Sequence, residues 1–229
     1  MRIFAIADLH LSLNENVDKP MDIFGSGWEN HTARLEHNWK KEIREEDIVV
    51  LPGDLSWGLK FEEALPDLEW IHNLPGTKVA FKGNHDLWWS GIKKLNALFD
   101  DMHFVQNEAF MASEDLAICG ARGWVIPGTD DFTEHDQKIY DRELRRLENS
   151  LKDAVSSGAR EILVAMHYPP AYIKKPTTEF TKVLHKYGIT HCVYGHLHGM
   201  LNFGRALRGV HDGIYYRLVS LDYLYAQPD

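Results

Sequence analysis

Residues 78–86 read KVAFKGNHD, and this stretch decides the fold because an apolar run ends there in a polar, metal-capable cluster. Residues 77–82 are predicted to form a buried strand. Asn84 then offers a neutral carbonyl oxygen, His85 an imidazole that can act as ligand or proton donor, and Asp86 a carboxylate that can hold that imidazole. Such a cluster after a strand predicts the edge of a metal site that handles a charged substrate. The remaining ligands must come from elsewhere in the chain.

The length and charge of the chain limit the number of domains and the kinds of partner that it can have. The 229 residues suffice for one large domain or two small ones, and no repeat or linker divides the sequence, so a single domain over residues 1–229 is predicted. Lys and Arg number 25 and Asp and Glu 34, which gives a formal net charge of −9. Because an acidic surface repels nucleic-acid backbones and anionic membranes, a phosphorylated substrate would need local positive charge. Bound metal can supply that charge.

The two cysteines and the apolar segments indicate the compartment. Cys119 and Cys192 each lie inside an apolar run, which predicts buried, reduced thiols. Residues 1–7 are apolar but too short for a signal peptide, and no apolar stretch reaches transmembrane length. We therefore expect a cytoplasmic protein that does not enter membranes.

Apolar periodicity divides the chain into strands and helices. Buried strands are predicted at residues 2–7, 47–52, 77–82, 161–166 and 190–194, with strand-like pieces over 103–125 and 201–221. Helices are predicted at residues 31–44, 61–73, 89–99, 134–157 and 178–187. Asn30 is a candidate N-cap of the first helix, and Pro66 fits best in the first turn of the second. The alternation predicts a layered α/β domain.

Residues 12–30 show no periodicity and are rich in turn formers. A loop of this length in a compact domain is usually functional or disordered. Because it leaves the end of the first predicted strand, it is either a lid or a surface insertion.

Polar clusters follow five of the predicted strands. They are Asp8-Leu9-His10, Gly53-Asp54, Gly83-Asn84-His85-Asp86, His167 and Gly195-His196-Leu197-His198. In an extended chain, residues two apart point to the same side, so Asp8 and His10 can reach one metal; a turn Asp and a surface His is the alternative. Because ligands gather at the carboxyl ends of strands in open α/β sheets, we expect the five clusters to converge on one crevice.

This ordered set resembles the calcineurin-like metallophosphoesterase superfamily, over the chain from Asp8 to His198. All five motif blocks are present in the family's order. The Asp-x-His motif alone is weak evidence for the family, whereas the Gly-Asn-His-Asp and Gly-His-x-His motifs are far more specific. The resemblance implies an α/β (α+β) fold, a four-layer αββα sandwich of two mixed β-sheets flanked by helices.

The resemblance also implies a dinuclear metal centre. It assigns Asp8, His10 and His198 to one metal, Asn84, His167 and His196 to the second, and Asp54 to both. Mixed imidazole, carboxylate and amide ligands suit Mn, Fe or Zn better than Ca or Mg. Two metals about 3.5–4 Å apart can clamp a phosphate and generate the hydroxide that attacks phosphorus. The implied activity is hydrolysis of a phosphomonoester or phosphodiester without a protein nucleophile.

Each of the residues around the expected ligands has two possible roles. His85 is the candidate general acid or cationic stabiliser, with Asp86 holding its imidazole; its alternative is a structural histidine. Arg122 is either a phosphate clamp, because Arg presents a bidentate fork, or a solvent-exposed charge at a strand end. The aromatic residues near the motifs either wall a pocket for a base or aryl group or pack the loops against the sheets; they are Trp57, Trp88, Trp89 and Tyr168.

One departure from the family narrows the substrate. Protein Ser/Thr phosphatases of this superfamily carry an arginine shortly after the Gly-Asp motif, whereas residues 55–58 read LSWG. This favours the compact bacterial-type phosphohydrolases and a phosphorylated small molecule. The acidic balance counts against long nucleic acids. A non-catalytic protein-binding scaffold of the same fold is the competing hypothesis, although none of the expected ligands is lost; the oligomeric state stays open.

Overall fold

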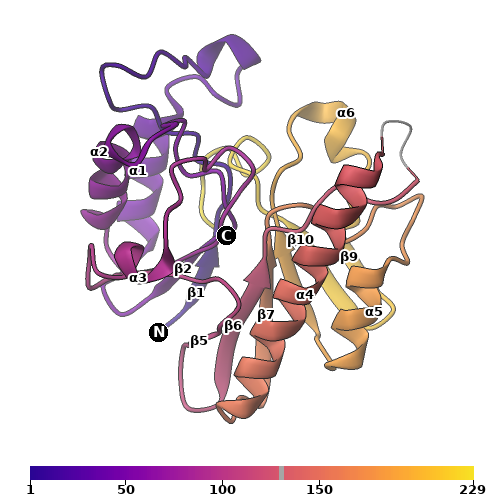
Figure 1. Ribbon diagram of the computed structural model, residues 1–229. Coiled ribbons are helices and arrows are strands. Elements are labelled where there is room, and N and C mark those ends of the chain that lie inside the picture. Colours follow the sequence, from indigo (N-terminus) through magenta and orange to yellow (C-terminus); the bar gives the residue numbers. More distant parts are fainter. Residues whose placement is uncertain (129–131) are drawn as a thin grey trace.

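Two β-sheets lie face to face at the centre of the computed structural model, which describes residues 1–128 and 132–229 (Figure 1). The first sheet has the spatial order β1 (Ile3–Ala5), β2 (Ile48–Leu51), β3 (Thr77–Ala80) and β4 (Met102–Phe104). The second has the order β5 (Phe110–Met111), β6 (Leu116–Ala121), β7 (Glu161–Met166), β8 (His191–Tyr194), β10 (Ile214–Leu218) and β9 (Gly209–His211). The four-layer sandwich is confirmed. Only the second sheet is mixed, however, because the described strands of the first all pair in parallel.

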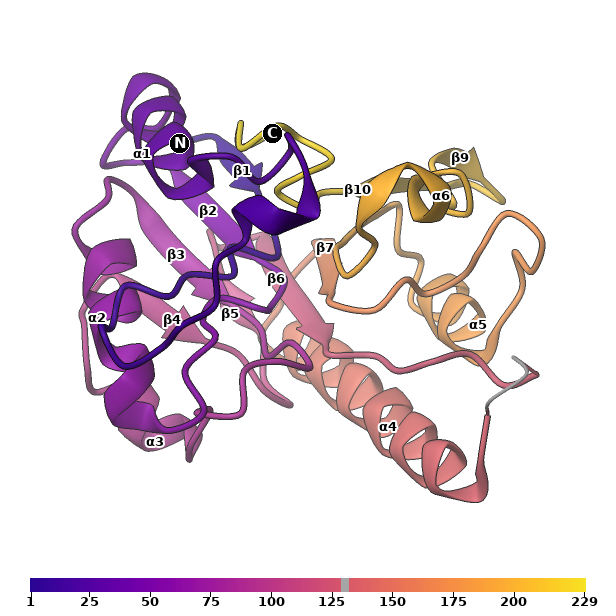
Figure 2. The same ribbon diagram turned by 90° about the horizontal axis from the view of Figure 1, so that it is seen from above.

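Helices cover the outer face of each sheet (Figure 2). The helices α1 (His31–Glu42), α2 (Phe61–His72) and α3 (Ile92–Leu95) lie beside the first sheet, and α4 (Glu134–Ser156) and α5 (Glu179–Lys186) lie beside the second. A short helix, α6 (Gly199–Phe203), follows β8, and a 3₁₀ turn, η1 (Asp22–Phe24), precedes α1.

The alternation of side chains along β2 shows how the layers form. Val49 and Leu51 belong to the core shared with α1 and α2, whereas Ile48 and Val50 belong to the core between the two sheets. Because both faces of the strand are covered, its sequence is an unbroken apolar run. Cys119 and Cys192 are buried free thiols, as predicted.

The ends of β1 and β10 join the two sheets. The backbone N–H of Ala7 donates to the carbonyl of Val219 at 2.8 Å, and the N–H of Leu221 donates to the carbonyl of Ala7 at 3.0 Å. The carboxyl ends of strands from both sheets therefore meet at one edge of the sandwich.

Several local predictions were wrong for identifiable reasons. The helix expected over residues 89–99 shrinks to α3, because Trp89 packs against Phe104 instead, with ring centroids 5.2 Å apart. Residues 199–203 form α6, where strand-like structure was expected from residue 201. Asn30 occupies the N-cap position of α1 but has a positive φ of 48° and makes no capping hydrogen bond with its side chain.

Pro66 lies in the middle of α2, not in its first turn. A proline there leaves the carbonyl of the residue four positions earlier without its helical donor. The side-chain amide of Asn14 donates to that carbonyl, Glu62 O, at 3.4 Å. A hydrogen bond from a distant loop thus compensates for the proline inside the helix, whereas the sequence rule places proline in the first turn.

Gly120 on β6 tests how closely its backbone packs against the adjacent strand β7 and against the facing sheet. A Cβ there would overlap the carbonyl oxygen of Ala165 on β7 and lie 2.8 Å from the Phe81 ring after β3. We expect Gly120→Ala to lower the free energy of unfolding by about 1–3 kcal/mol, as overpacking does, measured by urea denaturation. Gly91→Ala is the matched control, because a Cβ at Gly91 meets nothing within 4 Å. Equal stability of the two variants would contradict this packing.

Candidate metal centre

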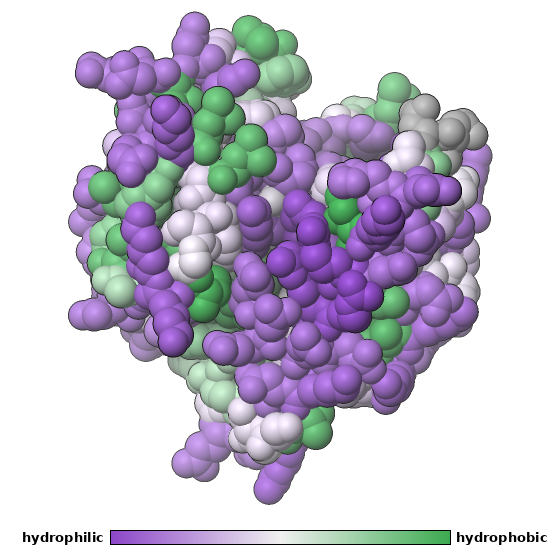
Figure 3. Space-filling model, in the orientation of Figure 1, coloured by the Kyte–Doolittle hydropathy of each residue, from purple (hydrophilic) through white to green (hydrophobic). Residues whose placement is uncertain are grey.

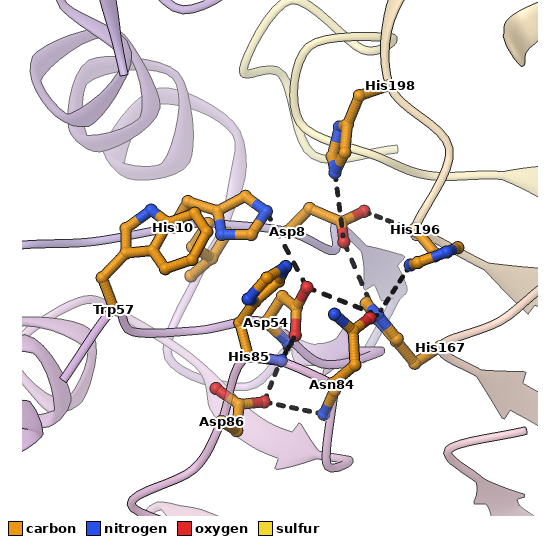
Figure 4. A network of polar contacts seen from close by, with 12 residues as sticks. Asp8, His10, Asp54, Trp57, Asn84, His85, Asp86, His167, His196 and His198 are labelled. Carbon is orange, nitrogen blue, oxygen red and sulfur yellow. Dashed lines mark hydrogen bonds and ion pairs between the residues drawn. The ribbon is translucent and has the colours of Figure 1, made fainter. Parts of the chain in front are cut away.

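The seven predicted ligands lie together where strands of both sheets end (Figure 4). Asp8 and His10 follow β1, Asp54 follows β2, Asn84 follows β3, His167 follows β7, and His196 and His198 follow β8. Residues separated by up to 190 positions are thus neighbours, as the argument from parallel strand ends expects.

The first group of side chains is Asp8, His10 and His198, whose candidate ligand atoms all lie within 4.8 Å of one another. Asp8 Oδ1 is 3.7 Å from His198 Nε2, and His10 Nε2 is 3.8 Å from Asp54 Oδ2. Asp54 therefore lies between this group and the next.

The second group surrounds His167. Its Nε2 atom is 2.7 Å from Asn84 Oδ1, 3.4 Å from Asp54 Oδ2 and 3.2 Å from His196 Nδ1. Its Nδ1 atom is 3.0 Å from the carbonyl of Pro52, which leaves Nε2 facing the cluster. Several potential donor atoms thus point at one small volume, which is the arrangement a cation requires.

Four of these residues have left-handed backbone conformations. The φ angles are 62° at Asp8, 46° at His10, 54° at Asp54 and 70° at His196. Non-glycine residues in this region carry strain of order 1–3 kcal/mol and cluster at functional sites. Asp8 and His10 do come together, but the reason given from the sequence was wrong, because neither lies in an extended strand.

Glycines let the loops approach the two buried carboxylates closely. A Cβ on Gly83 would overlap the carboxylate of Asp54, and a Cβ on Gly195 would lie 2.5 Å from Asp8 Oδ2. The N–H of His85 donates to Asp54 Oδ1 at 2.7 Å, and the N–H of His196 donates to Asp8 Oδ2 at 2.8 Å. Each carboxylate therefore has one oxygen fixed by backbone and another facing the cluster.

The electrostatics of the cluster fit a cation. Burial raises the pKa of Asp8 to about 7 and that of Asp54 to about 6, and it lowers the pKa of His167 to about 3. Burial likewise holds the pKa of His10 and His196 well below the usual value, which keeps these imidazoles in the neutral form that binds metals.

Two buried polar atoms of the cluster lack a hydrogen-bond partner in the described part of the chain. They are Asp8 Oδ1 and His10 Nδ1. A buried polar atom without a partner is costly, and a bound cation would satisfy the Asp8 oxygen. The donors are carboxylate, imidazole and amide groups, which suit Mn, Fe or Zn.

Asp222 orients His198 and was missed from the sequence. Its Oδ1 atom is 3.0 Å from His198 Nδ1, and its Oδ2 atom accepts the N–H of Gly199 at 3.0 Å. Burial opposes the protonation of His198, but the carboxylates of Asp8 and Asp222 raise its pKa to about 9. The signal was present, because Asp222 follows a strand-like segment, as the other clusters do.

The carboxylate of Asp86 organises backbone and does not hold His85, so that prediction was wrong. Both of its oxygens are already hydrogen-bonded, and no bond to the His85 ring exists among the described residues. The five donors, at 2.7–3.4 Å, are the backbone N–H groups of Asp54, Leu55, Ser56 and Gly83 and the indole N–H of Trp88. The His85 ring lies against Trp57 instead, with centroids 4.4 Å apart.

Of the aromatic residues near the motifs, some line a pocket beside the cluster and others pack the protein core. Trp57 stacks on His10, with ring centroids 4.7 Å apart and planes 20° apart, and it lines a pocket of about 360 Å³ beside the cluster. Tyr168 packs against His196, with centroids 3.9 Å apart. Trp88 and Trp89 belong to the core between the first sheet and its helices.

Part of residues 12–30 packs beside the cluster. Trp28 is buried, with its ring centroid 5.6 Å from His10 and 5.3 Å from His198. The N–H of Leu13 donates to the buried carboxylate of Asp67 at 2.7 Å, which anchors the start of the segment. The segment thus has the position of a lid; its opening stays a prediction.

Arg122 is not a solvent-exposed charge, because only 13% of its side chain is exposed. Its Nη2 atom is 3.5 Å from Glu143 Oε1, and its guanidinium carbon lies 4.4 Å from the centre of the Trp124 ring. Its role as a phosphate clamp stays a prediction.

The described residues include no helix that is long and apolar enough to cross a bilayer.

Comparisons with known proteins show which family the chain resembles. The family model for calcineurin-like phosphoesterases matches residues 1–200. The Gene 66 protein of Mycobacterium phage D29 is 33% identical over 84 residues, which cover 37% of this chain and only 40% of the phage protein.

Solved structures align with most of this chain at low sequence identity. A protein of unknown function from Aquifex aeolicus, 14% identical, covers 99% of this chain and 93% of its own with a TM-score of 0.49. The phosphopantetheinyl hydrolase of Mycobacterium tuberculosis, also 14% identical, covers 95% and 88% with a TM-score of 0.49. A further solved chain, 10% identical, covers 93% and 88% with a TM-score of 0.56.

Asp222 offers a test of the metal site. We expect Asp222→Ala to weaken Mn²⁺ binding roughly 10–100-fold, because the imidazole of His198 loses the partner that orients it. Isothermal titration calorimetry of the metal-free protein measures this change. Asp115→Ala is the control, because that carboxylate is 60% exposed and lies just before β6, at the opposite end of the strand. An unchanged affinity in Asp222→Ala would contradict the role of Asp222 in orienting His198.

Proposed function

This chain belongs to the calcineurin-like phosphoesterase family, and from this premise we propose that it is a metal-dependent hydrolase of a phosphorylated small molecule. The observation that carries the proposal is the convergence of two buried carboxylates, four histidines and one asparagine on a single volume. The buried Oδ1 atom of Asp8, which has no hydrogen-bond partner among the described residues, supports a cation there.

The proposed ligand sets follow the two groups of side chains. Asp8, His10 and His198 would hold one metal, Asn84, His167 and His196 would hold the second, and Asp54 lies where it could serve both sets. Two bound transition metal ions supply positive charge for a phosphate and activate water near neutral pH. The backbone N–H groups of His85 and His196 fix Asp54 and Asp8, so that the free oxygens of these carboxylates keep their direction.

His85 is proposed to meet the leaving group. It is directly joined to the ligand Asn84, and its N–H is bonded to Asp54, yet its ring faces the pocket beside the cluster. From there the imidazole can give a proton to the leaving oxygen or stabilise the charge that develops on it. Asp86 acts as a positioning residue, because its carboxylate fixes the backbone of Asp54 and Gly83 on either side.

The pocket supports a small substrate. Its volume of about 360 Å³ suits a small organic group. Trp57 packs on His10 in the segment where the protein phosphatases carry an arginine, so no guanidinium of residues 55–58 reaches a phosphate there. The proposed substrate is a phosphomonoester or a phosphodiester. A cytoplasmic location and a single domain over residues 1–229 stay predictions.

The non-catalytic scaffold remains the competing function. It would be favoured if ligands were replaced or lay apart, and all seven are retained and lie at one edge of the sandwich.

Replacement of His85 separates chemistry from metal binding. With Mn²⁺ present, we expect His85→Ala to lower kcat for an aryl phosphate or an aryl phosphodiester about 10²–10⁴-fold, because the leaving oxygen loses its proton donor. The bound metal should stay at the wild-type level, since His85 is not a ligand. His185→Ala is the control, because His185 is an exposed histidine on α5.

Asp54→Asn should lose both activity and metal in the same assays. If His85→Ala and Asp54→Asn both kept the wild-type rate, the activity would belong to another site or to a contaminant.

A further inference from the structure

A pocket with apolar walls opens beside the candidate metal centre. Its walls are Met21, Phe24, Trp28 and Trp57, and the imidazoles of His85 and His198 border it on the side of the cluster. Figure 4 shows His85 between Trp57 and the ligands Asp54 and Asn84. A group attached to a phosphate at the cluster would therefore enter this pocket past His85.

The walls are fixed by their own contacts. Trp57 stacks on His10 at 4.7 Å, and its indole N–H donates to Met21 Sδ at 3.2 Å. Trp28 is 3% exposed and packs its ring against His198. The indole N–H of Trp57 is thus already bonded within the protein, and the pocket receives mainly apolar surface from these three residues.

The polar groups of the pocket lie on the side of the cluster, at the imidazoles of His10, His85 and His198 and the carboxylate of Asp222. Asp222 borders the pocket, but its two oxygens are bonded to His198 and Gly199. A hydroxylated group placed against the side chains of Met21, Phe24 and Trp57 would lose hydrogen bonds to water without gaining equivalent ones, whereas an apolar ring would gain by leaving water.

We propose that this pocket binds a compact apolar group, of the size of a phenyl ring, on the alcohol component of the phosphoester. The proposal rests on the proposed function and names its substrate class. The proposal also assigns a function to residues 12–30, because Met21, Phe24 and Trp28 all come from that segment. The segment selects the substrate by supplying one wall of the pocket.

Phe24 is the residue on which the selection can be tested. It lines the pocket while 65% exposed, so its ring can be removed without opening the core. Its neighbour Ile23 on η1 is 74% exposed and does not line the pocket. Figure 3 shows exposed apolar side chains at the top left of the molecule, where residues 12–30 lie in Figure 1, in contrast to the hydrophilic surface over α4.

The test compares two phosphonates that share one head group. Phenylphosphonate and methylphosphonate are titrated into Mn²⁺-loaded protein by calorimetry, at a pH at which both are dianions. We expect wild type to bind phenylphosphonate at least about tenfold more tightly, which corresponds to about 1.4 kcal/mol. Phe24→Ala should reduce this preference to about threefold or less and change the methylphosphonate Kd less than about twofold. Ile23→Ala should match wild type.

The outcomes separate this inference from the proposed function. If wild type hydrolyses phosphoesters but binds both phosphonates equally, the apolar pocket is not a substrate site and the phosphoesterase activity stands. A preference that survives in Phe24→Ala as fully as in Ile23→Ala would show that the η1 segment does not select the substrate. If no phosphoester is hydrolysed and neither phosphonate binds, both proposals fail.

Discussion

The carboxylate of Asp86 is the interaction on which the rest of the site depends. It accepts four backbone N–H groups and one indole N–H, and these donors come from the loop after β2 and the loop after β3. The loop after β2 and the loop after β3 are therefore held together by one side chain. This connection sets the left-handed backbone of Asp54 beside Gly83 and lets His85 donate its N–H to the Asp54 carboxylate.

A second constraint follows from burying Asp8 and Asp54 together. Two carboxylates at the edge of a sandwich are unfavourable when charged, and burial accordingly raises both pKa values. Each carboxylate is nevertheless held by a backbone N–H on one oxygen only, and the Asp8 oxygen that faces the cluster has no partner among the described residues. The arrangement is stable if cations offset the repulsion, and the neutral imidazoles of His10, His167 and His196 can complete the coordination of such cations.

Much of this could be predicted from the sequence, because apolar periodicity locates strands and polar clusters mark their ends. A layered α/β domain and the meeting of the five motif blocks follow from that pattern, whereas the sandwich of two sheets was implied by the resemblance to the calcineurin-like family. The left-handed conformations at Asp8 and His10 could not be predicted, since they are imposed by contacts with other loops. Asp86 was paired with its sequence neighbour His85, although adjacent side chains in a turn point in different directions. Trp28 was missed because its segment has no periodicity.

The metal content of the purified protein tests the account most directly. After supplementation with Mn²⁺ and removal of loosely bound ions, inductively coupled plasma mass spectrometry should find about two transition metal ions per wild-type chain. Protein that is folded but retains no metal under these conditions would contradict the dinuclear centre and favour the scaffold.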